Sequence, residues 1–99
     1  MVAVITGAST GIGAGIARLF LDQGAQLALM SRRADRLSQT ADALGSPERV
    51  LAIAGDVSVR EDAERLIDAT VARFGGIDIL VNNGDLPRTD GTPGLDAAE

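Results

Sequence analysis

Short apolar runs alternate with segments of helical periodicity along the first 84 residues, and this alternation constrains the fold more than any other feature. The runs are short, and the first is also continuous, as expected of a strand buried on both faces of a sheet. The four runs are Val2–Ile5, Leu27–Met30, Val50–Ala54 and Ile77–Val81. Strands that alternate with helices pair in parallel through right-handed crossovers. The sequence therefore predicts an α/β fold with about four parallel strands, one half of a doubly wound sheet.

The segments between the runs predict three helices. Apolar residues recur at helical spacing in Gly11–Asp22 and in Ala34–Leu44, so each range is expected to be one helix. The third helix is predicted to begin after Ser58, because Glu61 follows three residues later in the pattern of a capping box. Its inner face is expected to carry Ala63, Leu66, Ile67, Thr70, Val71 and Phe74.

Charge and composition exclude several classes of function. The net charge of −5 opposes binding to nucleic acid or to an anionic membrane. The sequence has no run of about 18 apolar residues and no visible signal peptide, so we expect a cytoplasmic protein. The absence of Cys and His argues against disulfides, thiolate chemistry and zinc sites.

A glycine-rich turn lies between the first predicted strand and the first predicted helix. Gly7 permits a sharp exit from the strand, and Gly11 and Gly13 allow a ligand and a neighbouring strand to approach the backbone. The N–H groups at the start of the helix suit a pyrophosphate, and Ser9 and Thr10 add hydroxyl donors. The turn therefore predicts a nucleotide site; the alternative is a purely structural strand-to-helix turn.

Three motifs, in this order, resemble those of the short-chain dehydrogenase/reductase family. Thr6–Gly13 resembles its T-G-x-x-x-G-I-G signature, Asp56-Val57 the pair that contacts adenine, and Asn82-Asn83-Gly84 the start of its N-N-A-G motif. The resemblance implies a Rossmann-type, three-layer fold whose first four strands take the order 3-2-1-4. It also implies a nicotinamide dinucleotide cofactor and the reversible oxidation of an alcohol to a ketone or aldehyde.

The end of the second strand is where such folds choose between NAD and NADP. An acid there binds the ribose 2′-hydroxyl of NAD, whereas this chain has Ser31-Arg32-Arg33. Arg32 can make a bidentate contact with a 2′-phosphate and Ser31 can donate a further hydrogen bond, so NADP is favoured and NAD is the second choice. The alternative is that Arg32 and Arg33 are solvated residues of the next helix. Thr10 stands where NADP-dependent relatives often carry a second basic residue.

The resemblance also implies roles after the third and fourth strands. Asp56 would accept a hydrogen bond from the adenine amino group while the backbone of Val57 reads the ring; the alternative for Asp56 is a turn that leads into the helix. Asn82 would be mainly structural, whereas Asn83 would lie near the ribose. Asp85 departs from the family, which has Gly there. The predicted cofactor-binding residues are Gly7, Ser9, Thr10, Gly11, Ile12, Gly13, Ser31, Arg32, Asp56, Val57, Asn83 and Gly84.

The catalytic groups of the family do not occur in these 99 residues. The family uses a Ser on the fifth strand and a Tyr-x-x-x-Lys pair on the next helix, and this sequence has neither Tyr nor Lys. The family comprises NAD(P)-dependent oxidoreductases that act on CH–OH groups. We nevertheless predict no catalytic and no metal-binding residue here, and no turnover by these residues alone.

Two segments of different character are predicted. Residues 1–84 form an NAD(P)-binding half-domain, and residues 85–99 form a loop-rich tail. The fourth strand, Ile77–Val81, would be an apolar edge without Lys or Pro, so we expect self-association or a missing C-terminal half that covers it. Three functions stay open: the NADP-binding part of an oxidoreductase, a non-catalytic nucleotide-binding module, and a structural or interaction relic.

Overall fold

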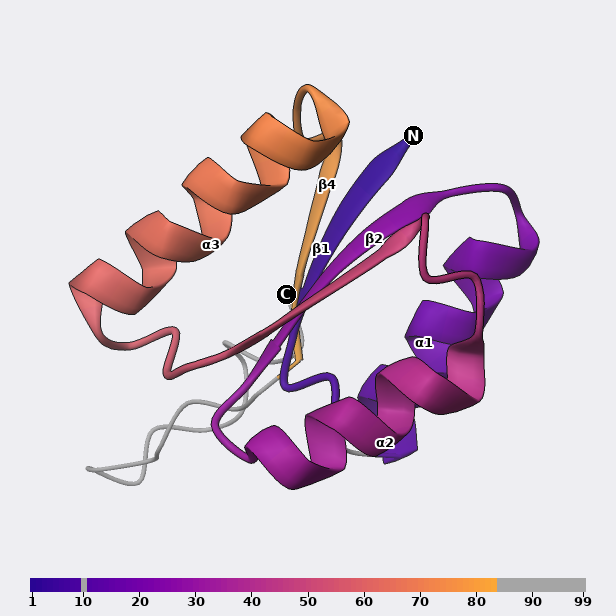
Figure 1. The fold of residues 1–99 in the computed structure, drawn as a ribbon, viewed down its shortest axis with the longest axis horizontal. Coiled ribbons are helices and arrows are strands. Elements are labelled where there is room, and N and C mark those ends of the chain that lie inside the picture. The colour runs from indigo at the N-terminus through magenta and orange to yellow at the C-terminus, as the bar shows by residue number, and fades with distance from the viewer. Residues whose placement is uncertain (10, 84–99) are drawn as a thin grey trace.

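Strands and helices alternate as the sequence predicts. The structure is a computed structural model that describes residues 1–9 and 11–83. Its elements are β1 (Val2–Thr6), α1 (Gly11–Asp22), β2 (Gln26–Ser31), α2 (Ala34–Leu44), β3 (Val50–Ala54), α3 (Arg60–Phe74) and β4 (Ile79–Asn82) (Figure 1). Thr10, Gly84, Asp85 and the tail predicted at 85–99 lie outside the described residues.

The four strands form one parallel sheet in the order β3-β2-β1-β4. β1 lies between β2 and β4, so that Val4 is opposite Ala28 on one side and Leu80 on the other. All five residues of β1 are buried, as are five of the six residues of β2. The predicted α/β fold of Rossmann type, with strand order 3-2-1-4, is therefore confirmed.

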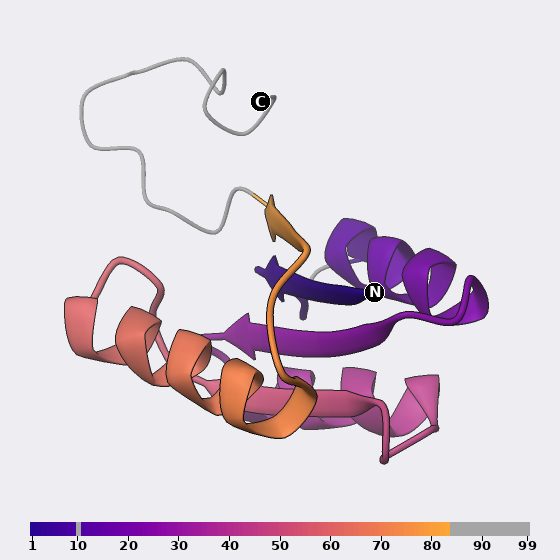
Figure 2. The same cartoon turned by 90° about the horizontal axis from the view of Figure 1, so that it is seen from above.

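Helices cover both faces of the sheet, which gives three layers. α1 and α2 lie on one face and α3 lies on the other (Figure 1), an arrangement that can also be followed from above (Figure 2). Side chains alternate between the two faces of a strand. Ile5 and Leu29 therefore belong to the core under α1 and α2, and Val4 and Met30 pack with Leu66 of α3 in the other core. Full burial of one such side chain contributes about 1.5–3 kcal/mol.

Two of the three buried residues of α1 are small. Its buried positions, at helical spacing, are Gly13, Ala17 and Leu21. Ile16 and Phe20 are partly buried beside them. Ile12, by contrast, is 73% exposed at the start of the helix. The small buried residues let the helix axis approach the strands closely, and the Ile12 side chain stays on the surface beside the glycine-rich turn.

α3 begins at Arg60 without the predicted capping box, so that prediction is wrong. Val59 precedes the helix, and no side chain caps its N-terminus. The Ser58 hydroxyl instead donates to Asp56 Oδ1 at 2.7 Å, and the Ser58 N–H donates to the same oxygen at 2.9 Å. The Val59 N–H closes the turn onto the Asp56 carbonyl oxygen at 2.9 Å. In a capping box the Ser58 hydroxyl would bind the N-terminus of the helix. Here the same hydroxyl binds Asp56 instead.

The buried face of α3 is narrower than predicted. Leu66 and Thr70 are buried, but Ile67 and Val71 are 40% and 45% exposed, so their assignment to the inner face is wrong. Each of the two exposed residues follows a buried one, which turns its side chain by about 100° around the helix axis. No element among the described residues covers that flank of α3.

Candidate functional site

The carboxyl ends of the four strands lie at one edge of the sheet, and the predicted motifs follow them. In the parallel register Thr6 is opposite Met30 and Asn82. Ser31 is opposite Ala54 in the same register. The glycine-rich turn, the Ser-Arg-Arg segment, the turn after β3 and the Asn pair therefore leave the sheet on one side. In open α/β sheets ligands bind in the crevice outside these strand ends.

Gly13 allows α1 to pack against the turn that precedes it. A Cβ at this position would lie 2.5 Å from the carbonyl oxygen of Gly7, 2.9 Å from Ala8 Cα and 2.7 Å from Asn83 Nδ2. Two of these atoms belong to the backbone, which cannot rotate aside as a flexible side chain can. The close approach of helix and turn therefore requires a glycine at position 13.

The start of α1 has the properties of an anion site. Gly7 has a φ of 66°, a left-handed conformation that favours glycine and turns the chain sharply out of β1. Apart from its chain neighbours and its own helix, no atom of the described residues lies within 4 Å of the position that a Cβ would take at Gly11, so their packing does not require this glycine. α1 has no acidic residue in its first turn to offset the positive end of its dipole. Such a helix start can receive a phosphate group.

A buried hydroxyl connects the glycine-rich turn to β4. Thr6 is 1% exposed, and its Oγ1 donates to Asn82 Oδ1 at 3.0 Å and accepts from the Asn83 backbone N–H at 3.3 Å. The Asn83 side-chain amide donates to the Gly7 carbonyl oxygen at 3.0 Å. Both asparagines therefore hold β4 to the first turn. This role of Thr6 is not predicted from the sequence, although a hydroxyl at the end of an apolar strand is a signal for it.

A second hydroxyl pair connects the turn to the end of β2. Ser9 Oγ and Ser31 Oγ are 2.7 Å apart, and either can be the donor. Ser31 is 2% exposed, and its Oγ also accepts from the Arg33 backbone N–H at 3.2 Å. Arg32, next to this buried serine, is exposed. The structure thus brings Ser9 and Ser31, two predicted site residues 22 positions apart, into direct contact.

Asp56 forms a turn that leads toward α3, which is the structural alternative to the predicted adenine contact. Its Oδ1 accepts from the N–H and the hydroxyl of Ser58, which is an Asx turn. These two hydrogen bonds lower the pKa of the Asp56 carboxyl, and the charge of Arg32 lowers it further. The carboxylate is therefore charged at neutral pH and can only accept hydrogen bonds. Neighbouring Val57 is half-buried.

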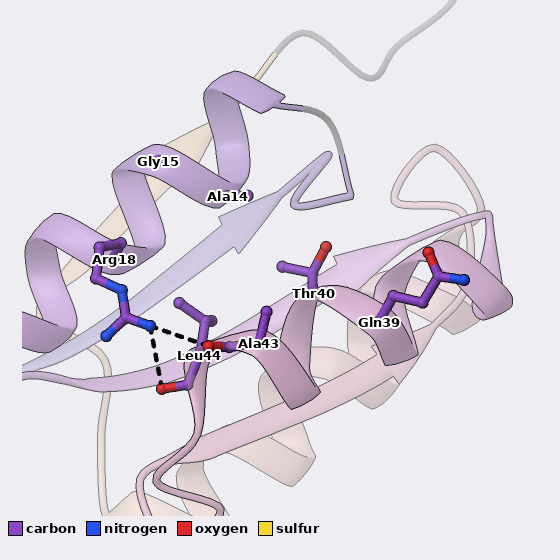
Figure 3. A pocket seen from close by; sticks show the side chains of 7 residues that line it. All are labelled: Ala14, Gly15, Arg18, Gln39, Thr40, Ala43 and Leu44. Carbon is purple, nitrogen blue, oxygen red and sulfur yellow. Dashed lines mark hydrogen bonds between the residues drawn. The ribbon is translucent and has the colours of Figure 1, made fainter.

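A cavity of about 390 Å³ between α1 and α2 belongs to the packing of these helices (Figure 3). It is lined by Ala14, Gly15, Arg18, Gln39, Thr40, Ala43 and Leu44. The Arg18 guanidinium donates to the carbonyl oxygens of Ala43 at 3.1 Å and Leu44 at 3.3 Å, drawn as dashed lines in Figure 3. Arg18 thus stabilises the end of α2, and none of the predicted cofactor-binding residues lines the cavity.

Two of the predicted positions, Thr10 and Gly84, lie outside the described residues. Within residues 1–9 and 11–83 no three His, Cys, Asp or Glu side chains are grouped so that they could hold a metal ion. The site that the structure does assemble thus consists of backbone at a helix start, hydroxyl groups, an exposed arginine and a carboxylate.

Comparison with known proteins identifies a matching family and relatives over most of the chain. The family profile of short chain dehydrogenase matches residues 1–99. The chain is 47% identical over 91 residues to 11-beta-hydroxysteroid dehydrogenase-like 2 of Arabidopsis thaliana, which covers 89% of this chain and 29% of that protein. It is 52% identical over 82 residues to 11-beta-hydroxysteroid dehydrogenase A of Arachis hypogaea, covering 80% and 23%. The chain thus spans less than a third of the length of these relatives.

Solved structures that are similar to this chain belong to the same family. A short-chain dehydrogenase/reductase from Brucella melitensis matches with a TM-score of 0.77 and 46% identity, over 80% of this chain and 34% of that one. A 3-ketoacyl-(acyl-carrier-protein) reductase from Brucella melitensis, complexed with NADH, matches with a TM-score of 0.74 and 35% identity, over 80% and 32%. The chain belongs to the short chain dehydrogenase family of oxidoreductases.

Proposed function

We propose that this chain is the NADP-binding part of a short-chain dehydrogenase/reductase that interconverts an alcohol and a carbonyl compound. The observation that carries the proposal is that the glycine-rich turn, Ser31-Arg32 and Asp56 meet at one end of the parallel sheet. Family membership supports a nicotinamide dinucleotide, and one solved relative is complexed with NADH. The preference for NADP rests on the residues of this chain.

The pyrophosphate is proposed to bind at the start of α1. The first N–H groups of a helix can donate to a phosphate, and α1 starts with Gly11 and Ile12. The hydroxyls of Ser9 and Thr10, which precede the helix in the sequence, are proposed as further donors. The close packing at Gly13 holds the helix start against this turn, so the phosphate oxygens meet a fixed set of donors.

The 2′-phosphate of NADP is proposed to bind Arg32 and Ser31. No acid stands at the end of β2 to repel a phosphate, and the exposed Arg32 guanidinium offers a bidentate contact. Ser31 has a single hydroxyl proton and already accepts from Arg33 N–H. It can therefore donate to the phosphate only when Ser9 is the donor in the 2.7 Å pair, and in that state the Ser9 hydroxyl does not donate to the pyrophosphate. Recognition by Ser31 thus depends on the glycine-rich turn.

The adenosine half is proposed to bind beyond β3 and β4. Both Ser58 hydrogen bonds fall on Asp56 Oδ1, so Oδ2 is the oxygen that would accept from the adenine amino group. The Val57 backbone would read the ring next to it. Asn83 and Gly84 would border the ribose. Because the Asn83 amide is bonded to Gly7, this part of the proposed site is held to the glycine-rich turn.

The bound nicotinamide would supply hydride transfer, and the residues described here would hold and orient the dinucleotide. Proton exchange with the substrate oxygen needs an acid–base group of suitable pKa. These 99 residues contain no Tyr, Lys or His. We therefore propose that the 99 residues alone bind the cofactor without turning over an alcohol or a carbonyl compound.

A thermal-shift measurement tests the proposal. A ligand that binds only the folded chain at about a hundred times its Kd stabilises it by about 2.7 kcal/mol. For a domain of this size that raises the melting temperature by about 10 °C or more. NADPH is expected to give this shift, and NADH a clearly smaller one at the same concentration.

The same measurement separates the open alternatives. If neither dinucleotide moves the melting temperature, the cofactor proposal is wrong and a structural or interaction role is favoured. If NADH shifts it as much as NADPH, the dinucleotide site stands and the NADP preference is wrong. Turnover of NADPH by the isolated chain with a carbonyl substrate would contradict the proposed lack of catalysis.

The exposed edge of β4 is proposed to pair with a second copy of the chain when the 99 residues are studied alone. Among the described residues β4 pairs only with β1, and Leu80 is 62% exposed. The strand carries neither Lys nor Pro, the residues that commonly prevent pairing of an edge. An unpaired apolar strand edge is a template for another strand. In a solution of the 99-residue chain, every other molecule carries the same exposed edge.

Sedimentation velocity over a wide concentration range is expected to show a concentration-dependent increase in the weight-average sedimentation coefficient. Leu80→Lys should lower this increase, whereas Ile67→Lys, on the exposed flank of α3, should leave it unchanged. A wild-type chain that sediments as a monomer at every concentration would refute the pairing.

A cytoplasmic location is proposed on sequence grounds. The helices in the described part of the chain are all too short or too polar to cross a lipid bilayer. The division into an NAD(P)-binding half-domain at 1–84 and a loop-rich tail at 85–99 is likewise a proposal, because its boundary falls at the end of the described residues.

A further inference from the structure

Two side chains of α3 hold the backbone on either side of Gly55. Asp62 Oδ2 accepts from the Asp56 backbone N–H at 2.9 Å. Arg65 Nη2 donates to the Ala54 carbonyl oxygen at 2.7 Å. A third hydrogen bond, 2.9 Å from Arg65 Nη1 to Asp62 Oδ1, joins the two side chains. The last residue of β3 and the first residues of the turn after it are therefore fixed to the same helix.

The space around Gly55 is closed by the same two side chains. A Cβ at Gly55 would lie 3.0 Å from Arg65 Nη2, 3.0 Å from Met30 Cε and 3.2 Å from Asp62 Cγ. On its other side, the Gly55 N–H donates to the Ser31 carbonyl oxygen at 2.9 Å. The turn is thus held between the end of β2 and the first turns of α3.

An ordinary surface ion pair would not produce this arrangement. Arg60 and Glu64, on the same helix, form a pair at 3.8 Å with side chains 87% and 66% exposed. Asp62 differs because it accepts from the backbone N–H of a predicted ligand-binding residue. A favourable interaction with the helix dipole would need only an acid in the first turn, and Glu61 already provides one.

We infer that Asp62 is a positioning residue for adenine recognition and that Arg65 holds Asp62 in place. By fixing the Asp56 N–H, Asp62 sets the direction in which the Asp56 carboxylate and the Val57 backbone leave the turn. Hydrogen bonds weaken steeply when they are misaligned, so the protein can recognise the polar edge of adenine only when its own donors and acceptors point in fixed directions. This inference rests on the proposed binding of adenine by Asp56 and Val57.

The test compares NADPH with its hypoxanthine analogue, in which a carbonyl oxygen replaces the adenine amino group. Dissociation constants are measured with the full 99-residue chain by titration of the intrinsic fluorescence of the reduced nicotinamide. The wild-type chain is expected to bind NADPH about tenfold more tightly, the effect of one well-placed hydrogen bond to a charged acceptor. Asp62→Ala should reduce this preference to about twofold or less. Glu64→Ala, the matched control, should keep it.

The preference ratio separates positioning from mere stabilisation. A purely structural role of Asp62 would weaken both dinucleotides equally and leave the ratio at its wild-type value, which would overturn the inference. Asp62→Asn retains an oxygen that can accept from Asp56 N–H and should keep most of the preference. If Asp62→Ala does not fold, Arg65→Ala takes its place, and an unchanged ratio in that variant also overturns the inference.

The two proposals fail in different ways. A wild-type chain that binds neither dinucleotide refutes the proposed function. A wild-type chain that binds both analogues equally leaves the dinucleotide site intact but refutes reading of the amino group, and with it the inference about Asp62.

Discussion

Gly13→Ala is expected to lower the melting temperature by about 5–20 °C and to abolish binding of NADPH. The new Cβ would lie 2.5 Å from the Gly7 carbonyl oxygen and 2.9 Å from Ala8 Cα, both backbone atoms. Overpacking of this kind costs about 1–3 kcal/mol, and each kcal/mol shifts the melting temperature of a domain of this size by about 4–8 °C. Relief of the clash would push α1 away from the turn, which displaces the proposed pyrophosphate donors.

Gly15→Ala is the matched control for this prediction. Gly15 lies in the same helix, two residues further on. Within the described part of the chain, no atom outside this helix lies within 4 Å of the position that a Cβ at Gly15 would take. Alanine is a better helix former than glycine by about 1 kcal/mol, so this variant should melt at the wild-type temperature or slightly above it. Differential scanning fluorimetry with and without NADPH measures both variants. A Gly13→Ala protein that melts and binds like the wild type would show that the turn does not pack as described.

Arg32→Asp is expected to reverse the cofactor preference. A charge-assisted hydrogen bond is worth about 1.5–3 kcal/mol, so loss of the proposed phosphate contact should weaken NADPH by about 10- to 100-fold. The new carboxylate would also repel the 2′-phosphate and could accept from the 2′-hydroxyl of NADH. The ratio of the NADPH and NADH dissociation constants, measured by fluorescence titration, should therefore change by about a hundredfold.

Arg36→Asp separates this local contact from the change in overall charge. Arg36 is exposed in the first turn of α2, and its replacement changes the net charge by the same amount. NADPH affinity in this variant should stay within about twofold of wild type at physiological salt, where exposed charges are screened. If Arg32→Asp and Arg36→Asp weaken NADPH equally, Arg32 does not contact the 2′-phosphate.

Three elements begin and end at the residues that the sequence predicts. Gly11–Asp22, Ala34–Leu44 and Val50–Ala54 were predicted with the bounds that the structure shows. The fourth strand begins at Ile79, not at the predicted Ile77. Asp78 lies between them, and its backbone N–H and its carboxylate both bond to the backbone of Val2 at 2.8 Å. Pairing with β1, which hydropathy does not reveal, therefore sets where β4 begins.

The parts of the site that sequence reasoning missed depend on distant partners. Thr6 meets Asn82 across 76 positions of sequence, so neither residue alone marks the contact. Asp62 and Arg65 look like ordinary charged residues of a surface helix until β3 is placed beside them. The capping-box prediction failed for a related reason, since Ser58 had two possible partners and the sequence pattern considered only one. The glycine-rich turn, by contrast, is predictable from the sequence. The backbone conformation at Gly7 and the close packing at Gly13 both favour glycine at those positions.

The central position of β1 has a consequence for how the chain folds. β1 meets β2 across 24 positions of sequence but meets β4 across 76, as in the pairs Val2–Gln26 and Ala3–Ile79. Closing the longer loop costs about 1 kcal/mol more conformational entropy. On the ribosome, β1 therefore pairs with β2 early and keeps one edge open until residue 82 has emerged. During that interval β1, whose five residues are all buried in the finished sheet, exposes an unpaired edge that a chaperone would protect.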